Sequence, residues 1–134
     1  MWIAAHERLL TNYRISRWGS GISPSCPTCG NGDETILNAL RDCVQSTRVW
    51  LRLVSSNHTT NFFSLNWRDW IFDNLNNKKM APHNIEWQTI FMVTCWHLWM
   101  WRNKSIFAEE FHRPFNPIDV ILKMATEIYN CKQT

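Results

Sequence analysis

Glycine is scarce in this 134-residue sequence: the chain holds four, and none lies in a phosphate-binding pattern. A P-loop or a dinucleotide-binding loop needs several glycines at fixed spacing, so enzymes built on such loops are excluded. No two aspartates are adjacent, and no GxSxG motif occurs. Two-metal phosphoryl transfer needs clustered carboxylates, whereas the aspartates here fit helix caps or exposed helix charges. We therefore predict that the chain by itself is not an enzyme and takes no small-molecule substrate.

Long hydrophobic runs are also missing. No stretch approaches the roughly 18 apolar residues of a membrane-spanning helix. The first five residues are apolar, but they lack a basic region before them and soon meet His6-Glu7-Arg8, so they do not form a signal peptide. We expect an intracellular protein, nuclear or cytoplasmic, with no membrane partner. Thiols stay reduced there, and a CxxC motif then binds metal more often than it forms a disulfide.

Tryptophan, in contrast, is abundant: the chain has nine, and 45% of its residues are hydrophobic. Each buried indole removes roughly 150–250 Å² from water, so a large core or a large partner surface is available. The net charge is +3 and the pI is about 8.7. Such a mildly basic chain permits nucleic-acid binding without demanding it, because dedicated binders usually have a pI above about 9.

Apolar residues recur at helical spacing along most of the chain, and the β-strand pattern is weak. We predict an all-α fold in which short helices surround a CxxC loop, followed by a long Trp-rich helix and a C-terminal helix. A polar loop is expected at residues 55–61. The expected helices cover approximately residues 1–10, 12–18, 33–42, 43–54, 66–75, 85–110 and 118–131.

A polar stretch at residues 76–84, with three asparagines, two lysines and a proline, is the best candidate for a linker. It divides the chain into a cysteine-containing domain, residues 1–75, and a helical connector, residues 85–134. The tryptophan stripe from Trp87 to Trp101 is expected to pack against a domain that the sequence does not contain. Cys95 and Cys131 lie on predicted helices, where cysteines usually pack in the core.

Three cysteines and one asparagine form the most informative pattern: Cys26-Pro-Thr-Cys29, then Asn38, then Cys43. A structural zinc ion takes four thiolate or imidazole ligands in a tetrahedron, and a CxxC turn supplies two of them. Asn38 stands where a fourth ligand is expected, and its neutral amide oxygen binds zinc poorly. Two interpretations stay open. Either the three cysteines hold zinc, with water or a neighbour such as His6 completing the site, or the site is a remnant.

Several segments combine into a more specific pattern: residues 6–12 (HERLLTN), 26–30 (CPTCG), 33–43 (DETILNALRDC), 49–50 (VW) and 94–104 (TCWHLWMWRNK). Together they resemble the zinc-binding region of plant LINE-type (non-LTR) retrotransposon polyproteins and the helical connector that comes after it. In that family the region follows a reverse transcriptase domain and precedes a ribonuclease H domain. The family pattern has a histidine where this chain has Asn38. The resemblance covers about residues 2–118 and implies a fragment, truncated at both ends, whose zinc site has lost one ligand.

The resemblance also implies partners, namely the reverse transcriptase and ribonuclease H domains of the parent polyprotein. RNA or DNA is a further candidate partner, because a guanidinium binds phosphate oxygens in a fixed fork. Trp18 either stacks on an unpaired base or packs in the core, and the arginines either contact phosphates or are merely solvated. The predicted nucleic-acid-binding residues are Arg8, Arg14, Arg17 and Arg41, with Arg48 and Arg52 on the following helix as possible additions.

The predicted function is therefore a non-catalytic fragment of a retrotransposon reverse transcriptase polyprotein, with a degenerate zinc knuckle and weak nucleic-acid binding. The alternative is a non-binding helical remnant, or a protein-interaction module built on the Trp-rich helix.

Overall fold

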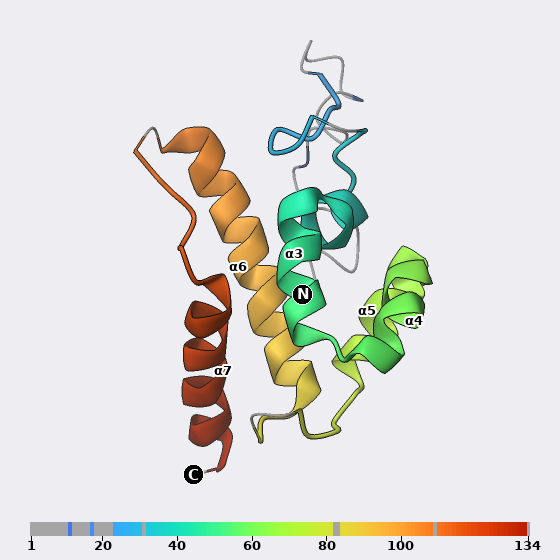
Figure 1. Cartoon of the computed structure of the whole chain (residues 1–134), viewed down its shortest axis with the longest axis vertical. Helices are drawn as coiled ribbons and strands as arrows, with labels where there is room; N and C mark the ends of the chain where they lie inside the picture. Colours follow the sequence, from blue (N-terminus) through green and yellow to red (C-terminus); the bar gives the residue numbers. More distant parts are fainter. Residues whose placement is uncertain are drawn as a thin grey trace.

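The structure, a computed structural model, describes residues 11, 17, 23–30, 32–81, 84–108 and 110–133. Within these ranges the chain forms α-helices, one π-helical turn and one 3-10 turn, and no β-strand (Figure 1). The all-α prediction is confirmed. The elements are, in order, η1 (Asn38–Asp42), α3 (Val44–Leu53), η2 (Ser56–His58), α4 (Thr59–Ser64), α5 (Trp67–Leu75), α6 (Trp87–Phe107) and α7 (Pro117–Gln133).

The starts of α5 and α7 follow local sequence signals. Asn66 caps α5, because its side-chain oxygen accepts a hydrogen bond from the backbone N–H of Asp69 at 2.9 Å. Pro117 opens α7, where its fixed φ angle and missing N–H are both tolerated. No helix in the described part of the chain is both long and apolar enough to cross a membrane. The helices expected at residues 1–10 and 12–18 lie outside the described residues, apart from Arg17.

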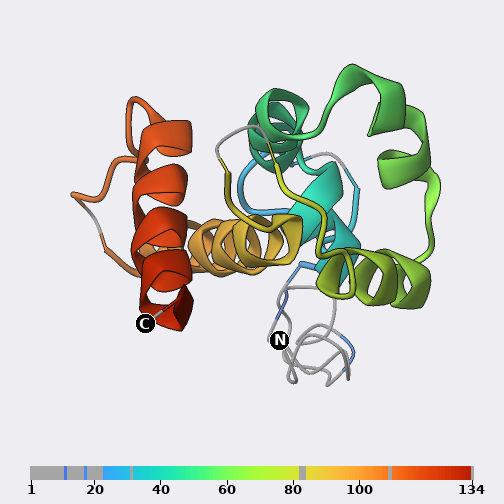
Figure 2. The same cartoon turned by 90° about the horizontal axis from the view of Figure 1, so that it is seen from below.

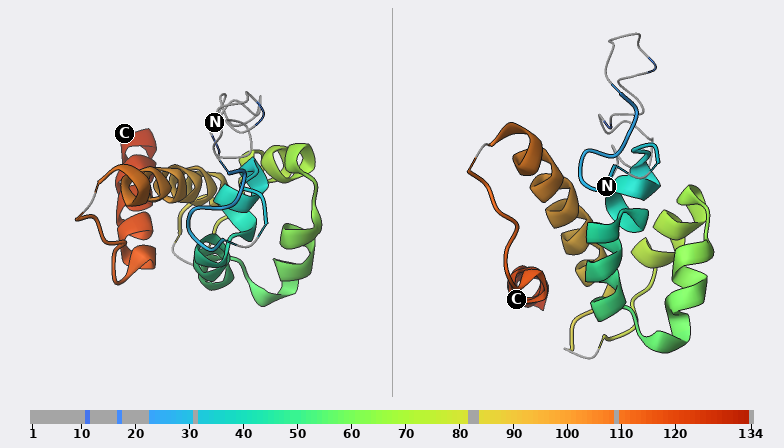
Figure 3. Two further views of the ribbon diagram at one scale, coloured as in Figure 1. Left: turned by 90° about the horizontal axis from the view of Figure 1, so that it is seen from above. Right: turned by 45° about the horizontal axis from the view of Figure 1, so that its top comes forward.

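The long helix α6 is the centre of the fold. It packs against α7 on one side and against α5 and η1 on the other (Figure 1, Figure 2). The turn η1 contacts α3 as well as α6, so it lies where the two helices come together (Figure 3). The cysteine-bearing loop precedes η1 and therefore sits at the N-terminal end of α3 (Figure 1).

Aromatic side chains fill the space between these helices. Trp50 on α3 is fully buried, and its ring centroid lies 4.9 Å from Phe62, 5.9 Å from Trp70 and 5.5 Å from Phe91. Edge-to-face and tilted contacts of this kind add stability beyond the area they bury. The indole N–H of Trp50 donates to the backbone oxygen of Leu40 at 2.6 Å, so its polar atom is also satisfied. This cluster joins α3, α4, α5 and α6 into one core.

The predicted role of the tryptophan stripe on α6 is wrong. Trp101 is 3% exposed, and Trp87 packs 6.2 Å from Trp50, centroid to centroid. The stripe fills the core of this chain because α3, α5 and α7 cover it. Only part of it faces outward, with Trp96 at 52% exposure.

Two further expectations about local structure need correction. Residues 55–61 were expected to form a polar loop, but they form η2 and the first half of α4, because burial of Phe62 holds this segment against the core. Cys95 is buried in the core as predicted, whereas Cys131 on α7 is exposed. The division of the chain at residues 76–84 stays a prediction, although one hydrophobic core includes residues from both sides of it.

Candidate metal centre

The loop that carries the first two cysteines is closed by backbone hydrogen bonds. The N–H of Cys26 donates to the oxygen of Gly32 at 3.0 Å, and the N–H of Gly30 donates back to Cys26 at 2.9 Å. Gly30 and Gly32 have φ angles of 70° and 77°, in the left-handed region that glycine adopts without steric cost. An isolated bridge between Ser25 and Asp33 joins the two ends of the loop. The sequence therefore folds this segment into a compact turn that presents its sulfurs.

The π-helical turn η1 brings the third cysteine to the same place. The backbone N–H of Cys43 donates to the oxygen of Asn38 at 2.8 Å, a bond between residues five apart. In an ordinary α-helix, residues five apart point about 140° away from each other. The wider π-turn brings them onto one face of the helix. At the end of this turn the Cys43 sulfur lies within 4.8 Å of the two sulfurs of the loop.

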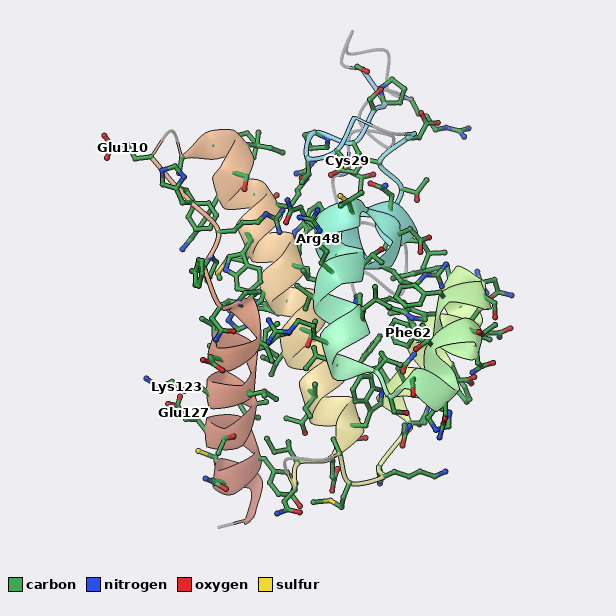
Figure 4. All side chains as sticks on the ribbon, viewed as in Figure 1. Cys29, Arg48, Phe62, Glu110, Lys123 and Glu127 are labelled. Atoms are coloured by element: carbon green, nitrogen blue, oxygen red, sulfur yellow. The ribbon has the colours of Figure 1, made fainter. Side chains whose placement is uncertain are left out.

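The three predicted ligands converge. The sulfurs of Cys26, Cys29 and Cys43 all lie within 4.8 Å of one another, and those of Cys26 and Cys43 are 3.6 Å apart. Zinc–sulfur bonds of about 2.3 Å in a tetrahedron need sulfurs about 3.8 Å apart, so the three thiols fit such an ion. Cys26 and Cys43 are each 3% exposed, and Cys29 is half-buried. Cys29 lies beside the N-terminal end of α3 (Figure 4).

Burial raises the pKa of the Cys43 thiol to about 12, the backbone N–H of Gln45 opposes this shift, and the neighbouring Cys26 and Cys29 add to it. Without metal, the thiol is therefore neutral at physiological pH. Burial lowers the pKa of the Arg113 guanidinium, while its charge interactions with Cys43 and Cys26 act the other way. A zinc ion with three thiolates carries one net negative charge, which the Arg113 cation would offset.

Asn38 contributes a buried side-chain oxygen at this turn. Its Oδ1 is buried and has no hydrogen-bond partner among the described residues, although its backbone N–H donates to Thr35 Oγ1 at 3.1 Å. A buried oxygen without a partner costs about 1–3 kcal/mol. The alternative fourth ligand, His6, lies outside the described residues. The assignment of position 38 as the fourth ligand position stays a prediction.

A buried ion pair fixes the cysteine loop to α6. Glu34, directly after the loop, receives two hydrogen bonds from the Arg102 guanidinium, one from Nε at 2.8 Å and one from Nη2. The side chain of Glu34 is 1% exposed and that of Arg102 is 5% exposed. Trp99 lies under the guanidinium, with its ring centroid 4.8 Å from Cζ. Neither Arg102 nor Arg113 was predicted from the sequence, because nothing local links them to cysteines some 60 to 90 residues earlier.

The predicted phosphate-binding arginines fall into three groups. Arg8 and Arg14 lie outside the described residues, and Arg17 is exposed. Arg41 must be removed from the set, because it is 5% exposed. Its guanidinium donates to Asp42 and to the backbone oxygen of Leu65 at 2.7 Å each. Arg41 therefore holds η1 against the start of α5 and has no surface to offer a phosphate. On α3, the two further candidates, Arg48 and Arg52, are exposed.

Comparison with known proteins identifies the part of the chain that carries this centre. Residues 1–50 match the family described as zinc-binding in reverse transcriptase. The match ends at Trp50, so it includes the CxxC loop, η1 and the first seven residues of α3. The resemblance drawn from the sequence is confirmed.

The likeness to a plant protein continues beyond the zinc-binding region. Over 129 residues, 96% of this chain, the sequence is 30% identical to an Arabidopsis thaliana protein named for ribonuclease H. That stretch extends past the residues that match the family, into helices α4 to α7. The chain spans 20% of the length of that relative. No solved structure gives a significant match.

Proposed function

We propose that the chain is a non-catalytic segment of a LINE-type retrotransposon reverse transcriptase polyprotein, in which a zinc knuckle organises a surface that contacts nucleic acid. The observation that carries the proposal is the convergence of three cysteine sulfurs within 4.8 Å, inside the residues that match the zinc-binding family. Structural zinc sites are built from closely spaced thiols of this kind.

Cys26, Cys29 and Cys43 would hold the ion, which would supply a cross-link between the CxxC loop and the N-terminal end of α3. The loop and η1 already bring the sulfurs together, so metal would stabilise this arrangement and not create it. Asn38 leaves the set one strong ligand short, and we therefore expect weaker zinc binding than a site with four thiolate or imidazole ligands would show.

Nucleic-acid contact would come from arginines next to the knuckle. Arg17 is exposed, and Arg8 and Arg14 lie close to it in the sequence. A guanidinium binds phosphate oxygens independently of base sequence, so the expected binding is weak, unspecific and sensitive to salt. The mild net charge of +3 is consistent with such a contact.

The reverse transcriptase and ribonuclease H domains of a parent polyprotein are the proposed protein partners. The support is the relative named for ribonuclease H, which is about five times as long as this chain. The alternative, an interaction module built on the Trp-rich helix, has lost the observation that motivated it, because Trp87 and Trp101 pack inside this chain.

The salt dependence of binding tests nucleic-acid contact. Zinc-loaded protein is titrated into three fluorescent nucleic acids, a single-stranded RNA, the matching DNA and a duplex, at salt concentrations between about 50 and 200 mM. Each phosphate contact adds roughly 0.7–0.9 to the steepness with which the logarithm of the binding constant falls against the logarithm of the salt concentration. Arg14→Ala and Arg17→Ala should each reduce that slope by about one contact. Lys123→Ala, on the exposed side of α7 (Figure 4), is the control and should leave it unchanged. Binding that is absent, or unchanged by salt, contradicts the proposal.

A further inference from the structure

We propose that a cavity at the C-terminal end of α3, far from the cysteines, binds a single unpaired nucleotide. The cavity has a volume of about 620 Å³ and lies between the end of α3, helices α4 and α5, and residues 77–81. Pockets that hold small ligands measure roughly 300–1,000 Å³. The inference rests on the proposed nucleic-acid contact for its choice of ligand, but the pocket itself is a separate site.

The wall of the cavity contains an indole whose orientation is fixed. Trp87 is half-buried, and its Nε1–H donates to Asn74 Oδ1 at 2.8 Å. Asn74 in turn donates from Nδ2 to the backbone oxygen of Trp70 at 2.7 Å and is 8% exposed. Phe62, which lies between α4 and α3 (Figure 4), contacts the Trp87 ring edge-on at 6.5 Å. A rigid, partly open aromatic surface of this kind suits a nucleobase, because every base has a face that can stack.

Amide groups lie beside the indole. Asn77 accepts a hydrogen bond at Oδ1 from the backbone N–H of Lys79 at 3.0 Å, and its backbone oxygen accepts one from Gln88 at 3.0 Å. Asn77 lines the cavity, and its Nδ2 donates to no acceptor among the described residues. Asn61, on α4, adds a second side-chain amide to the lining. Amides of this kind can bond the edge of a base whose face stacks on Trp87.

Two cationic side chains lie at the rim of the cavity. Arg52 at the end of α3 and Lys79 in the segment before α6 both line the cavity and are exposed. Neither forms an ion pair within the described part of the chain. His58 also lines the cavity, and Asp73 is the one carboxylate among the described lining residues. Two cationic side chains beside an aromatic wall match a phosphate attached to a base, which is the chemistry of a nucleotide.

The position of the cavity fits a strand that also touches the knuckle. Cys43 precedes α3 and Arg52 lies near its other end, and a helix of ten residues is about 15 Å long. A single-stranded nucleic acid could therefore contact both sites within a few nucleotides. The same pocket chemistry would accept a free mononucleotide, and the experiment separates these two sources.

The test compares two double variants with the same change in charge. Arg52→Ala/Lys79→Ala removes both rim cations, whereas Arg68→Ala/Lys78→Ala removes two exposed cations nearby that do not line the cavity. Each protein is titrated with a fluorescent oligouridine of eight nucleotides and with a duplex. It is also titrated with free uridine monophosphate, and binding of this mononucleotide is followed through the indole N–H resonance of Trp87. We expect the first double variant to weaken single-strand binding about tenfold and the second less than twofold, with the duplex affected equally by both.

The outcomes distinguish the two proposals. If both double variants weaken oligouridine binding equally and the Trp87 resonance does not move, the pocket is wrong while general phosphate contact stands. If wild type binds free nucleotide at Trp87 but no oligonucleotide, the pocket stands and the proposed nucleic-acid contact fails. If the wild-type protein binds neither the oligonucleotides nor the free nucleotide, both the pocket and the proposed nucleic-acid contact are wrong. Unfolding curves of the variants show whether each is folded, and Arg52→Lys/Lys79→Arg, which keeps both charges, should retain binding.

Discussion

Arg102 and Glu34 meet as a buried, two-point ion pair, although 68 residues separate them in the sequence. Glu34 directly follows the cysteine loop, and Arg102 stands near the C-terminal end of the central helix α6. The pair therefore links the candidate metal centre to the aromatic core without any metal. Three consequences of the fold and one of the metal centre can be measured.

Removing one partner of this pair should destabilise the protein strongly. Glu34→Ala leaves the Arg102 charge buried without its carboxylate, which costs about 3–5 kcal/mol of unfolding free energy in comparable sites. Urea unfolding followed by circular dichroism measures it. Glu127→Gln, an exposed change on α7, is the control and should stay within about 0.5 kcal/mol.

Because Glu34→Ala on its own could prevent folding, the double variant Glu34→Leu/Arg102→Met provides the decisive comparison. Apolar side chains of similar size can replace a buried ion pair with little loss of stability, so the double variant should be more stable than Glu34→Ala. A double variant as unstable as the single one would show that the charges are needed for more than their mutual neutralisation.

Trp50 should be the most sensitive aromatic residue of the core. It is fully buried and its Nε1 donates to Leu40, so Trp50→Phe removes volume and leaves that carbonyl without its donor. We expect a loss of about 2–4 kcal/mol in the free energy of unfolding. Trp96→Phe makes the same chemical change at a residue that is 52% exposed and should cost less than about 0.5 kcal/mol. Equal losses would contradict the core as described.

Local signals were sufficient to predict the helices that the sequence itself delimits. The Asn66 cap, with Asp69 three residues later, and Pro117 at the start of α7 both mark a boundary in a short window. The thiol cluster was likewise predicted, because a CxxC turn and a third cysteine carry their spacing in the sequence. These features depend on residues close together in the chain.

The missed features depend on contacts between distant residues. Arg41 has the sequence signature of an exposed helix charge, but the backbone oxygen of Leu65, 24 residues later, satisfies its guanidinium in the interior. The tryptophans of α6 repeat at helical spacing, and spacing alone does not say whether the covering surface belongs to this chain or to another. The π-turn at Asn38 also has no sequence signal. Its hydrogen bond, from the N–H of Cys43 to the oxygen of Asn38, depends on the contacts that the two ends of the turn make elsewhere in the fold.

Alkaline pH should destabilise the protein through Cys95. Complete burial raises the pKa of this thiol above its ordinary value, so the folded state holds the proton more tightly than the unfolded state does. That stability is fully present below about pH 9 and is lost as the pH rises further, at up to about 1.4 kcal/mol per pH unit. Cys95→Ala should show a shallower decline above pH 9 than wild type in denaturant unfolding. Cys131→Ala, at an exposed position, should keep the wild-type slope; identical slopes for all three proteins would contradict the assignment.

Position 38 should control metal affinity. The π-turn links Asn38 to Cys43 through a backbone hydrogen bond, and the buried Asn38 Oδ1 has no partner among the described residues. We therefore expect an imidazole at position 38 to reach a metal ion held by the three sulfurs and to act as a fourth strong ligand. Asn38→His should raise zinc affinity at least about tenfold, or ~1.4 kcal/mol. Cobalt binding, read from the thiolate-to-metal absorption band, measures this without any activity assay. Affinity should rise with pH in both proteins, because Cys43, with its pKa near 12 when metal is absent, must lose its proton to bind. Cys43→Ser should abolish the band, whereas Cys95→Ala should leave it intact. If Asn38→His binds cobalt no better than wild type, position 38 does not face the thiols, and the missing ligand must come from elsewhere.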